Sequence, residues 1–175
     1  MHTVTSFPPI ANPSAHTLIL GSIPGVLSLQ AQQYYAHPRN AFWSIMGNVH
    51  GFDIELPYAA RVEKLKASGL ALWDVLQSCS RHGSLDSAIE EGSRVPNDFA
   101  RFFAQHPHIR LVAFNGTEAE KSFNAYVLPK LSIRNMCFVR LPSTSPAHAA
   151  RSLAQKTEAW RVALCLSPSP SPSNF

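Results

Sequence analysis

The chain has 175 residues, of which 45% are hydrophobic and only 15% are charged. A chain of this length and composition forms one compact domain with its own core, which excludes a fibrous or largely disordered protein. Its formal net charge of +4 is a mild basic excess, which suits a phosphate-bearing partner without identifying one.

The first half of the chain predicts two strands with a helix between them. Residues 17–20 are a short apolar run without proline, as in a strand that is covered on both faces. Residues 59–68 place Val62 and Leu65 on one helical face and stop at Gly69, a residue type that commonly ends helices. Residues 70–75 are the next apolar run and predict the second strand.

The second half continues the alternation of strands and helices. Asn97 is a favoured residue type for a helix N-cap, and it precedes three phenylalanines that we expect on the buried face of a helix. Strands are predicted at residues 111–114 and 137–141, with a helix at residues 117–127 between them. A last helix is predicted from about residue 146 to residue 166. Its expected buried residues are Leu153, Trp160, Ala163 and Leu164.

This alternation predicts an α/β layer fold with a mainly parallel sheet. We expect a single domain over residues 1–166, followed by a loose Ser/Pro-rich tail at residues 167–175. In such folds, ligands bind beyond the carboxyl ends of the strands. This rule points to the segments that begin at Gly21, Asp74, Asn115 and Pro142.

The cysteines and the N-terminal residues indicate the cellular setting. Cys79, Cys137 and Cys165 form no CxxC pair, and no Cys/His cluster has the spacing of a zinc or iron–sulfur site. The first residues lack the pattern of a signal peptide, and no apolar run is long enough to span a bilayer. We therefore expect a reduced cytoplasmic protein, nucleoid-associated if bacterial, with no metal and no membrane contact.

The segment after the first strand carries most of the polar and aromatic chemistry. A glycine-proline-glycine turn at residues 21–25 lets the backbone approach a ligand closely. Residues 33–43 follow with aromatic side chains around Arg39 and Asn40. Aromatic rings can stack on a base, arginine can bind a phosphate, and an amide can read or polarise a base.

A second polar segment, residues 141–148, follows the last predicted strand. Its small hydroxyl residues precede the predicted last helix, and a free helix N-terminus binds phosphate readily. A serine hydrolase using this segment is a competing interpretation, but the chain has no GxSxG motif.

Together these two segments resemble motifs 1 and 2 of the uracil-DNA glycosylase superfamily, and they are most similar to its hypoxanthine-DNA glycosylase branch, family 6. Residues 72–76, with Arg81 and residues 83–86, also resemble that branch. The resemblance implies a three-layer αβα sandwich with a central, mainly parallel four-stranded sheet. It also implies a monofunctional glycosylase that needs no cofactor. The implied enzyme flips a deaminated base out of damaged double- or single-stranded DNA, and hypoxanthine is the base that the resemblance favours.

The resemblance also implies the site residues. Relatives specific for mismatched uracil or thymine carry an asparagine where this chain has Ile23, so their mechanism does not transfer at that position. In the hypoxanthine branch the functional asparagine matches Asn40, which is the implied catalytic residue. The implied base pocket is Gly21, Ser22, Ile23, Pro24, Gly25, Phe42 and Asn115, and the implied DNA-binding residues are Arg39, Ser143, Thr144, Ser145 and His148.

Several structural interpretations stay open beside these. Asn40 could cap a helix that opens at Ala41, and Ser143 and Ser145 could cap the last helix. Asp74 could fasten the adjoining loop by hydrogen bonds. At the level of function, we expect a monomer acting on deoxyinosine; the alternatives are a glycosylase for uracil or for G:T and G:U mismatches, and a non-catalytic protein that binds damaged DNA.

Overall fold

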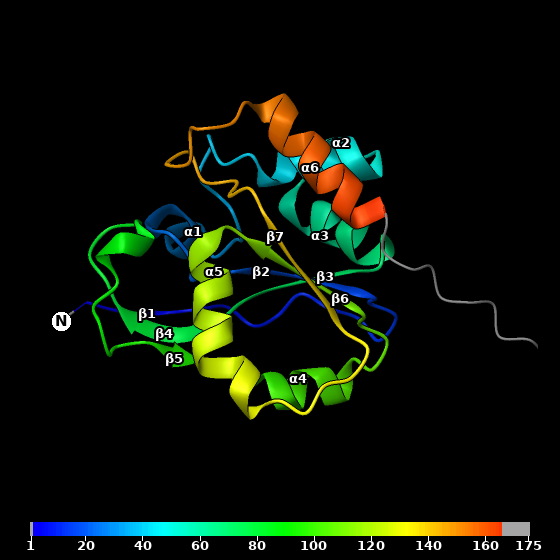
Figure 1. Ribbon diagram of the computed structural model, residues 1–175. Helices are drawn as coiled ribbons and strands as arrows, with labels where there is room; N and C mark the ends of the chain where they lie inside the picture. The colour runs from blue at the N-terminus through cyan, green and yellow to red at the C-terminus, as the bar shows by residue number, and fades with distance from the viewer. Residues whose placement is uncertain (1, 166–175) are drawn as a thin grey trace, which may run out of the picture.

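Four parallel strands form the central sheet, in the order β3–β2–β6–β7, in a computed structural model that describes residues 2–165 (Figure 1). The predicted tail at residues 167–175 and the predicted helix end at residue 166 lie outside these residues. The strands are β1 (Thr3–Thr5), β2 (Thr17–Gly21), β3 (Leu70–Asp74), β4 (Leu76–Ser80), β5 (Val95–Pro96), β6 (Leu111–Asn115) and β7 (Cys137–Leu141). The helices are α1 (Val26–Ala31), α2 (Phe42–His50), α3 (Tyr58–Ala67), α4 (Phe99–Gln105), α5 (Thr117–Ser122) and α6 (Leu153–Cys165), with shorter turns η1 (Asp86–Ala88), η2 (Phe123–Val127) and η3 (Leu128–Lys130).

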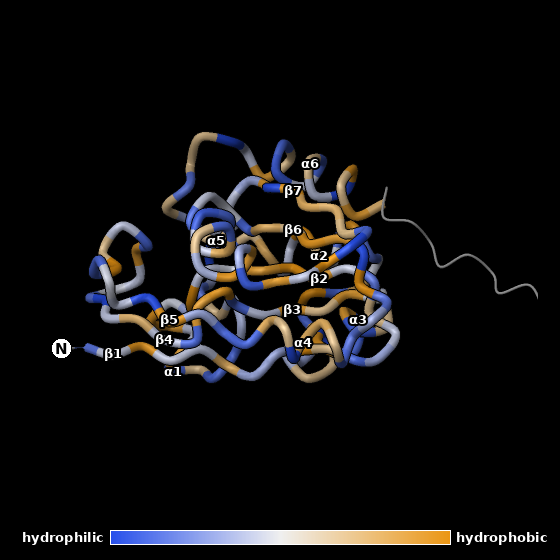
Figure 2. Tube along the Cα trace, turned by 60° about the horizontal axis from the view of Figure 1, so that its bottom comes forward, coloured by the Kyte–Doolittle hydropathy of each residue, from blue (hydrophilic) through white to orange (hydrophobic). Residues whose placement is uncertain are grey.

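Helices cover both faces of this sheet, because successive strand residues point to opposite sides. Ile19 of β2 belongs to a cluster with the buried faces of α2, α3 and α6, whereas Leu18 and Leu20 belong to a second cluster with α4 and α5. Figure 2 shows β2 and β6 as the most hydrophobic stretches, as expected for strands buried on both faces. The three-layer αβα sandwich is therefore confirmed.

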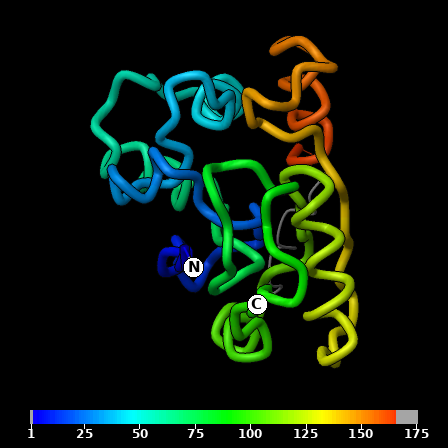
Figure 3. The backbone as a smooth tube through the Cα atoms, turned by 90° about the vertical axis from the view of Figure 1, so that its left-hand side faces the viewer, coloured from blue at the N-terminus to red at the C-terminus, as the bar shows by residue number. Residues whose placement is uncertain are grey.

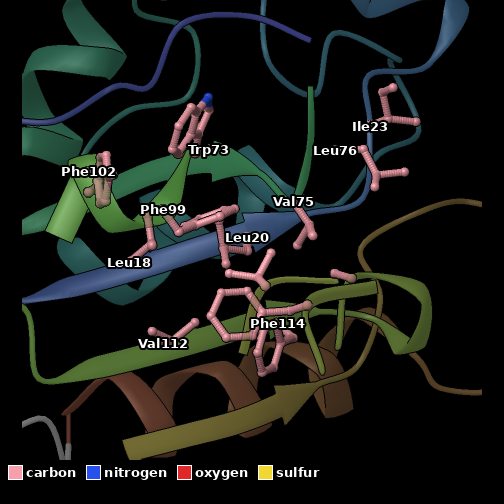
Figure 4. Packing of buried hydrophobic residues seen from close by; sticks show 14 of the residues in the cluster. Leu18, Leu20, Ile23, Trp73, Val75, Leu76, Phe99, Phe102, Val112 and Phe114 are labelled. Atoms are coloured by element: carbon pink, nitrogen blue, oxygen red, sulfur yellow. The ribbon is translucent and has the colours of Figure 1, made fainter. Parts of the chain in front are cut away.

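The second cluster is rich in aromatic side chains. Figure 4 shows Phe99 and Phe102 of α4 close to Trp73 of β3, and their ring centroids lie 5.0 and 5.1 Å from that of Trp73. These are ordinary contact distances for aromatic pairs. The packing holds β3 in place, and the carboxyl end of β3 carries Asp74.

A small antiparallel sheet in the order β1–β4–β5 lies beside the main one, and the sequence did not predict it. The predicted strand at residues 70–75 ends at Asp74, and β4 begins two residues later at Leu76. β1 and β5 are only three and two residues long, so neither carries a readable alternation. This sheet fixes the start of the loop that follows β4.

Three helix predictions need correction. The N-cap of α4 is Asp98, whose side chain accepts from the N–H of Arg101, whereas Asn97 donates to the carbonyl of Asp74. The helix predicted over residues 117–127 ends as α5 at Ser122 and continues as a π-helical turn. α6 begins seven residues later than predicted, and Leu153, expected to be buried, is 53% exposed.

The late start of α6 has a local cause. Ser152 Oγ accepts from the N–H of Gln155, and Gln155 Oε1 accepts from the N–H of Ser152, so the two form a reciprocal capping box. Residues 141–148 consequently do not end in a helix N-terminus, and neither Ser143 nor Ser145 caps α6. No helix within residues 2–165 is long and apolar enough to cross a membrane.

Candidate active site

A cavity of about 440 Å³ opens at the edge of the main sheet where the carboxyl ends of its strands meet. Figure 3 views this side of the molecule, with the segment before α2 in blue to cyan and the loop after β7 in orange. The two segments meet directly, since the N–H of Ala41 donates to the carbonyl of Thr144. The residues that line the cavity are Gly21, Ser22, Ile23, Pro24, Gly25, Val26, Leu27, Ser28, Tyr34, Tyr35, His37, Arg39, Asn40, Asp74, Ser84, Leu85, Asp86, Asn115, Ser143, Thr144, Ser145, Pro146 and Ala147.

Asn40 lies at this cavity, immediately before α2. Its Oδ1 accepts from the N–H of Phe42 at 3.0 Å, and its backbone N–H donates to the carbonyl of His37. The first bond turns the amide oxygen toward the helix and leaves the NH₂ group, which has no hydrogen bond within the described residues, for the cavity. Asn40 therefore satisfies the start of α2, and as a residue that lines the cavity it keeps an NH₂ donor without a partner among the described residues.

Asn115 and Thr144 complete one side of the cavity, and we call Asn40, Asn115 and Thr144 the amide wall. Asn115 Nδ2 donates to Thr144 Oγ1, and Asn115 Oδ1 accepts from the N–H of Thr144, both at 2.9 Å. The pair ties the end of β6 to the loop after β7. Thr144 is only 1% exposed, so the prediction that it contacts DNA is wrong: its hydroxyl faces Asn115 instead of solvent.

Another part of the lining carries carboxyl groups, and we call Ser22, Asp74 and Asp86 the acid wall. Ser22 Oγ donates to Asp86 Oδ1 at 2.6 Å, and burial raises the pKa of Asp86. Asp74 is 3% exposed at the end of β3, and burial followed by the charge of Asp86 raises its pKa to about 7. Two ionisable carboxyl groups thus line one cavity.

The loop after β4 holds the turn of residues 21–25 against the acid wall. The guanidinium of Arg81, 1% exposed, donates to the carbonyls of Gly83 and Pro24. Ser84 Oγ accepts from the N–H of Val26 at 2.9 Å. These bonds, with the one from Ser22, fix the shape of the turn through side chains that are distant from it in sequence.

Tyr34 and Tyr35 are both among the residues that line the cavity; Tyr34 is 4% exposed, and Tyr35 is the more exposed of the two. The Tyr35 ring stacks on that of Phe42, with centroids 4.2 Å apart and an interplanar angle of 25°. Phe42 itself is completely buried among α2, α6 and the sheet. The prediction that Phe42 faces a base is therefore wrong, because Tyr35 lies at the cavity and Phe42 supports it from behind; Trp43 is in the core, as predicted.

The amino-acid sequence matches a known protein family along most of its length. The family model described as the uracil DNA glycosylase superfamily matches residues 8–173. The chain belongs to the uracil-DNA glycosylase superfamily.

Individual relatives support the same family. The chain is 38% identical over 114 residues to a hypoxanthine DNA glycosylase of Methanosarcina barkeri, covering 65% of this chain and 71% of that protein. It is 36% identical over 141 residues to a hypoxanthine DNA glycosylase of Methanosarcina acetivorans, covering 75% and 88%. It also resembles the solution NMR structure of a candidate uracil DNA glycosylase from M. acetivorans, with a TM-score of 0.75, 30% identity, and 92% and 98% coverage.

Membership of this superfamily makes the chain a DNA glycosylase, a hydrolase of N-glycosidic bonds that binds DNA as substrate. In this glycosylase the turn of residues 21–25, Asn40 and Asn115 meet at one cavity, as the sequence placed them. Arg39 is exposed at the cavity, and Ser143 and Ser145 also line it and are partly exposed.

His148 lies apart from the residues that line the cavity. Its side chain is exposed, and its carbonyl accepts from Lys156 Nζ. The described hydroxyl groups do not form a serine-hydrolase site either: Ser143 Oγ and Ser145 Oγ accept from the N–H groups of Ser145 and Ala147, and within residues 2–165 neither bonds to a histidine. No group of three or more His, Cys, Asp or Glu side chains suited to a metal ion occurs among those residues.

Sequence reasoning did not single out Tyr35, Asp86 or Ser84 as cavity residues. Tyr35 stood in the aromatic run of the first motif, and its left-handed backbone, with φ of 55°, is a feature that the sequence pattern did not indicate. Ser84 and Asp86 come from a loop about 60 residues distant in the chain from the turn they contact. Their signal in the sequence was the resemblance of residues 83–86 to the family.

Proposed function

We propose that this DNA glycosylase removes hypoxanthine from deoxyinosine in DNA and leaves an abasic site. Two relatives at 36–38% identity carry the name hypoxanthine DNA glycosylase, which supports this substrate. A base inside duplex DNA cannot reach an enclosed cavity, so the nucleotide must flip out, at a cost of a few kcal/mol that is smallest in weakened pairs. An inosine–thymine pair, formed when adenine is deaminated, is such a weakened pair.

The orientation of Asn40 is the observation that carries the proposal. Cleavage of the N-glycosidic bond builds negative charge on the departing base, so a preorganised donor directed at the base stabilises the transition state. The bond from the N–H of Phe42 to Asn40 Oδ1 holds the amide with its NH₂ group available to the cavity. An amide does not titrate near neutral pH, so the donor is present under all working conditions.

Tyr35 is the proposed platform on which the flipped base stacks. Stacking on an aromatic ring contributes roughly 1–3 kcal/mol per base, which is comparable with the cost of flipping. The ring is held by its stack on Phe42, so it needs no rearrangement to receive a base. Since the two free energies nearly cancel, contacts to the DNA backbone must add to the affinity.

Four exposed or partly exposed side chains are proposed to make those backbone contacts. They are Arg39, Ser143, Ser145 and His148. None of the described residues that line the cavity is a lysine, which supports simple hydrolysis without a Schiff base. One chain supplies the whole cavity, so we propose a monomer, acting on double- or single-stranded DNA in the cytoplasm or at the nucleoid.

Excision from labelled duplexes tests the proposal. Oligonucleotides that contain inosine, uracil or a mismatched thymine are incubated with the protein and then with alkali, which breaks the strand at an abasic site. We expect the inosine strand to break fastest. Breakage confined to the uracil or thymine strands would show that the enzyme excises those bases instead of hypoxanthine. Stable binding without breakage would indicate a protein that binds damaged DNA without cleaving it.

The Asn40→Ala variant tests the role of the amide. Loss of one preorganised donor lowers the rate by about 10²–10³-fold, so the single-turnover rate of this variant should fall by that factor. Asn124 is an exposed asparagine outside the cavity lining, and Asn124→Ala is the matched control, expected to cleave like the wild type. Wild-type cleavage by Asn40→Ala rules the assignment out.

A further inference from the structure

Asp74 is a buried carboxyl group of the acid wall, and the proposed mechanism does not use it. It lines the cavity at the carboxyl end of β3 and is 3% exposed. Its Oδ2 has no hydrogen-bond partner within residues 2–165. A polar atom buried without a partner costs free energy, so its retention beside a ligand cavity needs an explanation.

Gly21 shows how closely the carboxyl group packs beneath the cavity. A Cβ added at Gly21 would lie 2.6 Å from Asp74 Oδ1 and 2.9 Å from Tyr35 Oη. Asp74 therefore sits against the backbone of the first motif and beside the ring proposed to stack on the base. Asp74 and a base stacked on Tyr35 would therefore be neighbours in the cavity.

A structural role for the Asp74 side chain finds no support in its contacts. The adjoining loop is fastened to the main chain of this residue, because Asn97 Nδ2 donates to the Asp74 carbonyl at 2.9 Å. Arg81 donates from Nε and Nη2 to the carbonyls of Gly83 and Pro24, its Nη1 has no partner, and no hydrogen bond or ion pair joins it to Asp74 among the described residues. The carboxyl group itself is left for another partner.

The groups that face Asp74 favour its neutral form. Asp86 lies across the acid wall, and Tyr34 and Tyr35 approach from the segment before α2. Arg81, after β4, is the one opposing charge that acts on it. Burial, first, and then Asp86 raise the pKa of Asp74 to about 7 against the influence of Arg81, so the carboxyl group is mostly protonated in mildly acidic solution.

A neutral carboxyl group offers one O–H donor beside one C=O acceptor. The Watson–Crick edge of hypoxanthine presents O6, an acceptor, beside N1–H, a donor, so the two edges pair through two hydrogen bonds. An ionised carboxylate is acceptor-only, which still suits N1–H but repels O6. A carboxamide has the same donor and acceptor as the neutral acid and does not titrate.

We propose that Asp74 reads the flipped base as a neutral acid, donating from one carboxyl oxygen to O6 and accepting from N1–H with the other. This inference rests on the proposed function, since it names the residue that recognises the lactam edge of hypoxanthine. The enzyme thereby keeps a carboxylic acid protonated so that it can act as a donor, a use of burial known from other active sites.

The test compares single-turnover excision of hypoxanthine at several values between about pH 5.5 and 9. The wild-type rate should fall by about tenfold per pH unit once pH passes the pKa of Asp74, about 7. Asp74→Asn should keep a rate within about tenfold of the wild type at low pH and lose this alkaline decline. Asp74→Leu, of similar size without hydrogen-bonding groups, should lose more than about tenfold at every pH.

Two further variants test the role of Asp74 without replacing Asp74 itself. Asp86→Asn keeps an acceptor for Ser22 but removes the charge that raises the pKa of Asp74, so its alkaline decline should begin at lower pH. Glu91 is exposed and lies outside the cavity lining, and Glu91→Gln should follow the wild-type profile.

Each outcome decides between distinct claims. If the wild type releases no hypoxanthine at any pH, the proposed function fails. If the wild type is active but Asp74→Asn retains the same alkaline decline, or is folded and inactive, the inference fails and the proposed function stands. If Asp74→Asn does not fold, an unshifted decline in Asp86→Asn overturns the inference and a shifted one supports it.

Discussion

The two walls of the cavity satisfy their polar groups in different ways. In the amide wall, Asn115 and Thr144 exchange two hydrogen bonds, and Asn40 is oriented by the backbone of α2. In the acid wall, Ser22 bonds to Asp86, but Asp74 Oδ2 has no partner among the described residues. Among the described residues, the group without a partner is the partly exposed Asn40 NH₂ in the amide wall, whereas in the acid wall it is a buried carboxyl oxygen.

This difference separates two tasks that a base-excising enzyme must perform. Amides do not titrate, and the bond from the N–H of Phe42 orients Asn40, so its geometry does not change with pH, which suits a donor for the transition state. A buried carboxyl group without a partner responds to pH and gains from a ligand that pairs with it. The amide wall is therefore suited to catalysis, and the acid wall to recognition.

Gly21→Ala is the substitution that should disturb the cavity most. Its new Cβ would overlap Asp74 Oδ1 and Tyr35 Oη, so a buried side chain on the acid wall and the stacking ring would both have to move. Misplacement of a reacting group by about 1 Å can cost about 10²-fold in rate, and we expect a loss of that size in single-turnover excision.

Gly25→Ala, in the same turn, is the control for Gly21→Ala. Its added Cβ would approach only Ser84, at 3.3 Å from Oγ, so the loss should be much smaller. Equal rates for the two variants would mean that Asp74 and Tyr35 can be displaced without loss of activity. The roles given to Asp74 and Tyr35 would then need revision.

Asp74→Asn should change how stability depends on pH. Folded Asp74, with a pKa near 7, holds its proton between roughly pH 4 and 7, whereas the unfolded chain has released it. The folded state then binds more protons, so wild-type stability falls as pH rises through this window, by up to about 1.4 kcal/mol per unit from this group. The carboxamide that replaces the carboxyl group in the variant cannot titrate.

Urea unfolding of the wild type and of Asp74→Asn at about pH 5, 6 and 7 measures this effect. The free energy of unfolding of the variant should increase relative to that of the wild type with each pH unit. Glu91→Gln should stay parallel to the wild type, because that exposed side chain lies outside the cavity lining. A constant difference between wild type and Asp74→Asn would show that the carboxyl group titrates normally.

Most of the main sheet was predictable because its strands are continuous apolar runs. β7 was predicted at its observed bounds, and β2 and β6 each extend one residue further than expected. The small sheet was not predictable, since β1 and β5 are too short to show an alternation of apolar and polar residues. Both pair with β4, which is distant from them in the sequence. The start of α6 was missed because the capping pair of Ser152 and Gln155 was not recognised.

Site residues that stand in one continuous motif were predictable from the sequence. Residues whose position depends on how the chain packs were not. Asn40 lies at the cavity, as the motif around it predicted, and its catalytic role stays a prediction. The choice of Phe42 over Tyr35 failed, since both are aromatic residues of one motif and only the fold determines which is buried. The loop that supplies Asp86 reaches the cavity by a contact across 64 positions, so its signal in the sequence was its resemblance to the family and not a hydrophobic period.

Thr144→Val tests the amide wall and should have the smallest effect. Valine keeps the shape but removes the acceptor of Asn115 Nδ2, while the bond from the N–H of position 144 to Asn115 Oδ1 remains. Because Asn115 is partly exposed and its NH₂ group can reach water, the loss of unfolding free energy should be about 1 kcal/mol. Thr144→Ser, which keeps the hydroxyl, should lose less.

The decisive measurement for Thr144→Val is the pH profile of excision. The substitution alters no titratable group, so its rate should be lowered by the same factor at every pH and its alkaline decline should begin where that of the wild type does. A shift of that decline would mean that the amide wall helps set the ionisation of Asp74. The two walls would then act as one network, and the division between a catalytic side and a recognition side would fail.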